Sequence, residues 1–289
     1  MPINELEIHP YLNSINDENY ETNYFENLII GTFPIYSITN TLNPDGTELT
    51  RFNDHNAFMR FYYGSKQNSF WKLFSTSLLT FNPTSLDQEN RTNAAISLLI
   101  QNRFLITDIV FKTNRIDENS EDSELWVPSN DNFVNENRSL NTDIIRILNR
   151  NIGIKYLYFT STVLNGNSPF GWFRELLGDG CLYRIIHEVE NRVISASITI
   201  NEREYIAFFL PSPAGNGTRG LHFNRKRTQI FVNYLQSVDP DFYNEINLLA
   251  TSDRNTDQKT RLTQLRNNFL IESWRQVIVN KNRYFNGNI

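Results

Sequence analysis

The chain has 289 residues, of which 39% are hydrophobic and 20% are charged, so it can form one large α/β domain and is not disordered throughout. Lysine and arginine number 27 against 32 acidic residues, and the formal net charge is −5, so binding to nucleic acid would require positive charge concentrated on one face. A single cysteine, Cys181, excludes an internal disulfide and any four-cysteine zinc or iron–sulfur site.

The histidines and the N-terminal residues argue against a metal-dependent enzyme and against a secreted protein. The four histidines lack the spacing of metal ligands (His9, His55, His187 and His222). The first residues have neither the basic nor the apolar region of a signal peptide, and no apolar stretch approaches the ~20 residues of a membrane span. We therefore expect a soluble, cytoplasmic monomer that uses no metal and no cofactor and does not bind a membrane.

Four apolar runs predict buried strands, and segments of helical periodicity separate them. We expect strands at 28–30, 104–111, 154–160 and 205–210, and helices at 68–79, 87–102, from Ser139 onward, at 169–177 and through Trp274. Alternating residues at 192–200 predict a half-exposed strand that forms a hairpin with the last run. This order predicts a three-layer α/β/α fold around a central, mostly parallel four-stranded sheet.

The remaining segments are polar. Residues 1–25 predict a loose N-terminal arm with one helix, and residues 36–58 and 112–138 predict surface loops. Residues 238–260 predict a linker that leads to the last helix. One α/β domain is thus expected at 26–237, with 238–289 forming a linker and a helix that packs on the same domain.

Three short motifs occur in a fixed order along the chain. They are Gly31-Thr32-Phe33-Pro34 after the first strand, the segment 61–71 (FYYGSKQNSFW), and the segment 208–213 (FFLPSP) at the end of the last strand. Together they resemble the uracil-DNA glycosylase superfamily over about residues 25–235. The second motif is the most specific, because it is similar to the Tyr-Gly-x-x-x-Asn-x-Phe-Trp signature of the mismatch-specific and hypoxanthine-DNA glycosylase branches.

The resemblance implies a monofunctional DNA glycosylase with the fold of that superfamily. Such enzymes bind DNA, flip a nucleotide out of the duplex, stack its base on an aromatic ring and hydrolyse the N-glycosidic bond to leave an abasic site. A deaminated base such as hypoxanthine or uracil is the expected substrate. No lysine suited to a Schiff base is evident other than Lys66, so we expect no strand cleavage.

The resemblance also assigns roles in the first two motifs. It implies that Tyr63 stacks on the base, although a core tyrosine is the alternative. Asn68 matches the catalytic asparagine of the hypoxanthine branch, whose amide oxygen can align a water; the alternative, a helix N-cap, can coexist with that role. Phe33 stands where several branches have a water-positioning Asp or Asn, so Gly31, Thr32, Phe33 and Pro34 are expected only to shape the base pocket.

In the third motif, Leu210 replaces the histidine that stabilises the departing base in uracil-specific enzymes, which puts strict uracil specificity in doubt. Ser212 either contacts the base or a phosphate, or closes the turn. Pro211 and Pro213 are expected to border the DNA.

A basic, glycine-rich segment follows the third motif. In the superfamily this loop enters the groove of DNA, which makes Leu221, His222 and Phe223 candidates to fill the space left by the flipped nucleotide. Further cations are expected to contact phosphates (Lys66, Arg219, Arg225, Lys226 and Arg227). The alternative is that these charged residues are simply exposed to solvent before a helix and do not contact DNA.

Two other functions remain open. Insertions at 36–61, which include Asp54 and His55, and at 112–138 could enlarge the pocket for a bulky, hypermodified phage base, making the chain an anti-phage glycosylase. Alternatively, because Phe33 and Leu210 depart from the catalytic pattern, the chain could be a catalytically silent DNA-binding protein of the same fold. No nucleophile elbow, Walker motif or Rossmann motif is present.

Overall fold

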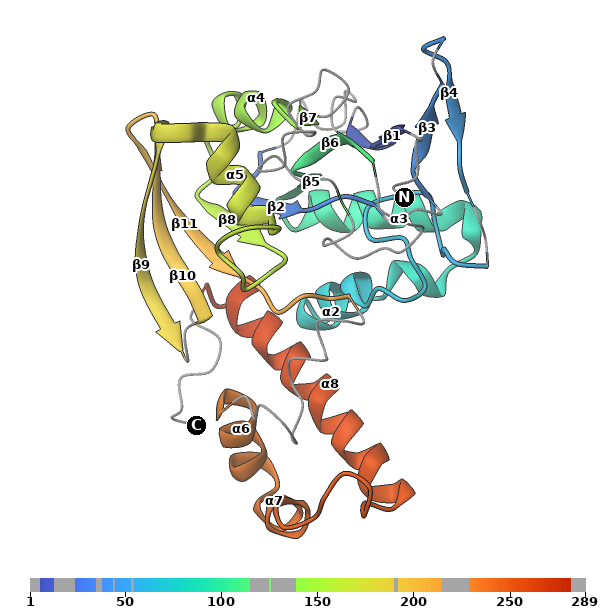
Figure 1. Cartoon of the computed structure of the whole chain (residues 1–289), viewed down its shortest axis with the longest axis vertical. Coiled ribbons are helices and arrows are strands. Elements are labelled where there is room, and N and C mark those ends of the chain that lie inside the picture. Colours follow the sequence, from blue (N-terminus) through green and yellow to red (C-terminus); the bar gives the residue numbers. More distant parts are fainter. Residues whose placement is uncertain are drawn as a thin grey trace.

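The computed structural model describes residues 6–12, 24–34, 38–43, 45–52, 55–114, 125, 139–189, 192–214 and 229–281. These residues form a mixed α/β protein with two sheets (Figure 1). The larger sheet has the strand order β5, β2, β8, β11, β10, β9, formed by Phe104–Asp108, Asn27–Gly31, Tyr156–Phe159, Arg203–Phe209, Arg192–Ile200 and Cys181–Val189.

The four predicted buried strands form the parallel part of this sheet. β2 pairs in parallel with β5 and β8, and β8 pairs in parallel with β11. The predicted hairpin of β10 and β11 is also present. The sheet nevertheless has six strands rather than four, because β10 and then β9 extend it antiparallel beyond β11. The sequence does not indicate β9, whose apolar residues Leu182, Ile185 and Ile186 are exposed.

Helices pack on both faces of the parallel strands, which explains why these strands are continuous apolar runs. Phe159 of β8 packs on Phe170 and Phe173 of α5 (Pro169–Leu177), with ring centroids 5.1 and 5.2 Å apart. On the opposite face, Phe104 of β5 meets Phe74 of α2 (Phe70–Ser77) edge to face at 5.1 Å. The other helices are α3 (Gln88–Gln101), α4 (Asp143–Arg150), α6 (Gln229–Val238), α7 (Pro240–Asn247) and α8 (Thr256–Ile278).

The smaller sheet was not expected. Its antiparallel strands have the order β4, β3, β1, β6, β7, formed by Glu48–Thr50, Asn40–Leu42, Leu6–Ile8, Val110–Thr113 and the two-residue edge strand Ser139–Leu140. The prediction of a loose arm at 1–25 is therefore wrong for residues 6–12, and the predicted loop at 36–58 contains a hairpin. Buried Glu7 accepts a hydrogen bond of 2.7 Å from the Thr39 hydroxyl, which links β1 to the segment before β3.

Three predicted boundaries also change. The predicted strand 104–111 divides at Ile109 into β5 and β6, which belong to different sheets. The helix predicted from Ser139 begins at Asp143. The predicted linker at 238–260 contains α7, whose N-cap Asp239 accepts a hydrogen bond from the Phe242 N–H.

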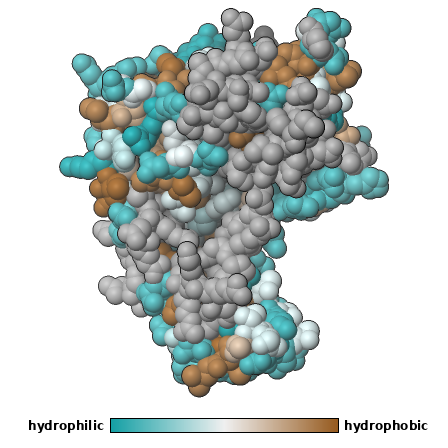
Figure 2. Space-filling view, in the orientation of Figure 1, coloured by the Kyte–Doolittle hydropathy of each residue, from teal (hydrophilic) through white to brown (hydrophobic). Residues whose placement is uncertain are grey.

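The last helix, α8, joins two parts of the molecule. It runs from beside α7 up to the larger sheet (Figure 1), and it packs along α2. In Figure 2, hydrophilic side chains cover much of the visible surface, and apolar patches lie at the left, toward the β9–β10 hairpin. Among the residues described, no helix is both long and apolar enough to cross a bilayer.

Candidate active site

The carboxyl ends of four parallel strands lie along one edge of the larger sheet, which is where α/β folds place their sites. Gly31 ends β2 and Asp108 ends β5, while Thr160 and Leu210 follow β8 and β11 directly. The first and third motifs therefore lie at the same edge. The turn after β2 is fixed by its backbone, because the Gly31 carbonyl accepts a hydrogen bond of 3.0 Å from the N–H of Ile109.

The second motif reaches the same edge through hydrogen bonds to the third. Asn68 forms an antiparallel bridge with Ala214, and the Ser69 N–H donates to the Pro213 carbonyl at 2.8 Å. Trp274 of α8 holds both motifs together. Its Nε1–H donates to the Pro211 carbonyl at 3.2 Å, and its ring meets Phe70 edge to face at 5.5 Å. The structure thus brings the three motifs into one place.

Tyr63 is held in an unusual conformation within this group. Its φ of 55° lies in the left-handed region, which costs a bulky residue on the order of 1 kcal/mol or more and is often found at functional sites. Its half-buried ring stacks on Phe70 at 4.2 Å with an interplanar angle of 9°. Its hydroxyl donates to Thr160 Oγ1 at 3.1 Å. A base can therefore stack on Tyr63 only on the ring face turned away from Phe70.

Asn68 supports the start of α2, although it is not the N-cap that the sequence left open, because the N-cap is Ser69. Its Oδ1 accepts a hydrogen bond of 2.8 Å from the Phe70 N–H, the first residue of α2. The side chain is half-buried, while its neighbours Gln67 and Ser69 are exposed. A carbonyl oxygen has two lone pairs, so this bond leaves Oδ1 able to accept a second hydrogen bond from a water. The catalytic role of Asn68 stays a prediction.

Other predicted residues have clear structural roles. Ser212 closes its turn, because its Oγ accepts a hydrogen bond of 3.3 Å from the Ala214 N–H. Leu210 is fully buried in the core. Phe33 packs edge to face on the ring of His9 at 5.8 Å, and Thr32 and Pro34 are buried beside it. Lys66 is exposed, with its Nζ 5.9 Å from the centre of the Phe58 ring.

The predicted DNA-binding segment lies outside the residues that the structure describes. This concerns seven predicted residues within 215–228 (Arg219, Leu221, His222, Phe223, Arg225, Lys226 and Arg227). The same holds for Asp54. His55 is exposed.

Sequence reasoning missed a buried pair at this edge, His9 and Asp108. His9 Nε2 lies 2.8 Å from Asp108 Oδ2, and the two side chains are 0% and 6% exposed. The sequence could have indicated Asp108, because this residue ends a predicted buried strand at the carboxyl edge of the sheet, where α/β folds place their sites. The sequence could not have indicated His9, because it follows a three-residue strand and lies 99 residues from Asp108.

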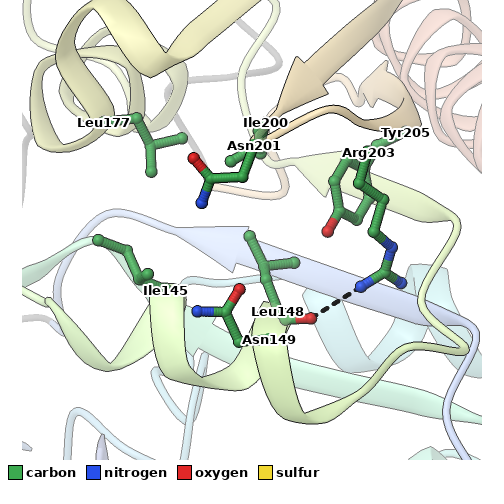
Figure 3. Close-up of a pocket in the computed structure, with 8 residues that line it drawn as sticks. All are labelled: Ile145, Leu148, Asn149, Leu177, Ile200, Asn201, Arg203 and Tyr205. Carbon is green, nitrogen blue, oxygen red and sulfur yellow. Dashed lines mark hydrogen bonds between the residues drawn. The ribbon is translucent and has the colours of Figure 1, made fainter.

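A pocket between α4 and the β10–β11 turn is a weaker candidate (Figure 3). It lies at the amino end of β11, away from the three motifs. The side chain of its one charged residue, Arg203, donates to the carbonyls of Leu148 at 2.9 Å and Ile154 at 2.7 Å. This arginine therefore serves to cap the end of α4 and the following turn.

The described residues offer neither a metal site nor a reactive thiol. No group of three or more His, Cys, Asp or Glu side chains in them could hold a metal ion. Burial raises the pKa of the Cys181 thiol to about 11, so the thiol is protonated at neutral pH and is a poor nucleophile. Comparisons with protein-family models, with curated proteins and with solved structures give no match to the chain.

Proposed function

We propose that the chain is a monofunctional DNA glycosylase of the uracil-DNA glycosylase type, acting on a deaminated base. The observation that carries the proposal is the meeting of its three motifs: the Asn68–Ala214 bridge joins the second motif to the third at the sheet edge where the first motif begins. Tyr63, the proposed stacking residue, projects its hydroxyl to Thr160 at the same edge.

The arrangement of strands and helices also supports the proposal. Four parallel strands have helices against both faces, and the motif turns follow their carboxyl ends. We propose that this arrangement is the three-layer α/β/α fold of the glycosylase superfamily. The β9 edge strand and the smaller sheet would then be additions to that fold.

The proposed chemistry is hydrolysis of one C–N bond. The bond between the base and C1′ breaks, the electron pair leaves with the base, and the sugar becomes an oxocarbenium-like cation. A water held by Asn68 Oδ1 adds its oxygen to C1′, and the proton that this water loses neutralises the anionic base, which leaves an abasic site and a neutral free base. Asn68 is suited to aligning this water because the Phe70 N–H fixes its side chain.

The test is an alkali-cleavage assay on labelled oligonucleotides that carry uracil, hypoxanthine or xanthine, alongside DNA from phages with ordinary and hypermodified cytosine. We expect abasic sites at one or more of the deaminated bases. Abasic sites only in the hypermodified DNA would replace this proposal with the anti-phage alternative. Their absence from every substrate would refute glycosylase activity on these bases and leave the silent DNA-binding alternative.

A further inference from the structure

The larger sheet ends in a long strand whose outer edge has no partner. β9 has nine residues and forms the edge of the sheet beyond β10 (Figure 1). Within the part of the chain that the structure describes, nothing bonds to the backbone of residues 182–186 from the outer side. Edge strands are commonly short, or carry proline or lysine that prevents pairing with another chain. β9 contains neither residue, so its outer edge can accept a further strand.

The register of β9 with β10 fixes which of its side chains share a face. The pairing is irregular near Ile186, but the register is the same on both sides of that point, so side chains alternate along the whole strand. On the inner face, the Tyr183 ring packs edge to face on Phe170 of α5 with centroids 5.4 Å apart. The opposite face, which we call the outer stripe, carries Leu182, Arg184, Ile186 and Glu188.

The outer stripe combines exposed apolar side chains with unpaired charges. Leu182 is 67% exposed and Ile186 is 55% exposed, although strand residues of this kind are usually covered. Arg184 and Glu188 are exposed as well, and neither forms an ion pair or a hydrogen bond with any described residue. A partner that buries the apolar side chains and pairs both charges would therefore match the stripe.

The outer stripe is complementary to a second copy of itself. When two identical strands pair antiparallel around a two-fold axis, the residue on the axis lies opposite itself. With the axis at Ile186, the two isoleucines meet, and each Arg184 lies opposite Glu188 of the other copy. An axis at Arg184 or Glu188 would set like charges opposite each other. An axis at Ile185 or His187 would set Ile186 opposite a charge, so charge and apolar pattern together select one register.

We propose that two copies of the chain pair antiparallel through β9, around a two-fold axis at Ile186, and form a symmetric dimer in which one sheet continues across both copies. The dimer replaces the monomer expected from the sequence. The inference is separate from the proposed function, because none of the three motifs lies in β9 or β10. Loss of the dimer and absence of glycosylase activity are therefore independent results.

The test is a pair of charge reversals followed by sedimentation of the full chain over a concentration series that reaches about 100 µM. We expect wild type to dimerise. Arg184→Glu or Glu188→Arg alone turns two attractive pairs into two repulsive ones and should raise the dimer Kd at least ~10-fold. The two changes together restore opposite charges and should return the Kd close to the wild-type value. Lys259→Glu, a reversal at an exposed position of α8, is the control and should leave the Kd unchanged.

Cross-linking tests the register directly. Cα atoms of directly opposite residues lie within about 5.5 Å, which a disulfide spans, so Ile186→Cys should form a covalent dimer on mild oxidation. Leu248→Cys, at a more exposed position after α7, should not. Equal cross-linking of the two variants would overturn the inference.

The oligomeric state gives the other contrary outcomes. Wild type that stays monomeric at the highest concentration overturns the inference. A dimer that the single reversals do not weaken, or that the double reversal does not restore, forms through another surface and overturns it as well.

Discussion

Asn68 has a structural role at the start of α2, so a variant of this residue could lose activity either through lower stability or through loss of catalysis. Its Oδ1 accepts the first free N–H of α2, and loss of such a bond costs a helix about 1 kcal/mol. We predict that Asn68→Ala lowers base excision by at least ~100-fold, because a water-aligning contact in the transition state is lost. Binding to DNA with an abasic site should stay near the wild-type level. The measurement is single-turnover excision with parallel Kd determination.

The matched control for Asn68 is Asn82. Its Oδ1 accepts the Thr84 N–H at 3.1 Å, the same two-residue turn, at the short 3₁₀ helix Pro83–Ser85. Asn82→Ala should cost similar stability in urea unfolding and leave excision intact. Equal losses of excision in the two variants, or near-normal excision by Asn68→Ala, would remove Asn68 from the mechanism.

At the scale of elements, the end of α8 is anchored to the sheet by the half-buried ammonium group of Lys281. Lys281 Nζ donates to Asn27 Oδ1 at 2.8 Å, to the Tyr158 hydroxyl at 2.6 Å and to the Ile278 carbonyl at 2.8 Å. The ring centres of Phe104, Tyr156 and Tyr158 lie 5.0–5.2 Å from the same atom. The anchor matters for the site because α8 also carries Trp274, which contacts the second and third motifs.

This anchor predicts a pH dependence of stability. Burial lowers the pKa of Lys281 to about 8, partly offset by the nearby Glu26, whereas an unfolded chain keeps a lysine pKa of about 10.4. Between these values the unfolded chain binds more protons, so the Lys281 contribution to the free energy of unfolding rises with pH. We predict that, above pH 8, the free energy of unfolding of wild type rises relative to that of Lys281→Met by at most about 1.4 kcal/mol per pH unit. Urea unfolding of both proteins from pH 7 to 9.5 measures this difference. Curves that stay parallel throughout would contradict it.

The elements also show which parts of the fold a sequence can predict. The parallel strands were predictable because burial on both faces makes each of them an apolar run, and α5 and β10 match their expected limits at 169–177 and 192–200. The smaller sheet was not predictable, because its strands have only two to four residues and their burial depends on partners distant in the sequence, such as Glu7 and Thr39, which are 32 residues apart. For the same reason the sequence did not indicate the buried pair of His9 and Asp108. The motifs indicated Tyr63 and Asn68 locally, but only the pairing of β1 with β6 places His9 beside Asp108.

At the scale of the whole molecule, the negative net charge of the protein disfavours binding to DNA, the proposed partner. The formal charge of −5 repels DNA at long range, so binding must come from a local group of cations. The sequence offers one dense group, Arg225, Lys226 and Arg227, directly before α6. If these residues contact phosphates, each contact releases condensed counterions, and the affinity becomes steeply dependent on salt.

We therefore predict that Arg225→Ala combined with Arg227→Ala weakens DNA binding and flattens its salt dependence. Two lost phosphate contacts should reduce the slope of log K against log salt by about 1.8. The control is Lys259→Ala combined with Arg261→Ala, two exposed residues near the start of α8, at its far end from the sheet (Figure 1). Both double variants change the net charge from −5 to −7, so a general charge effect would alter them equally. A flatter slope only in the first variant would locate the contact in the basic segment, whereas equal slopes in both would show that this segment does not touch DNA.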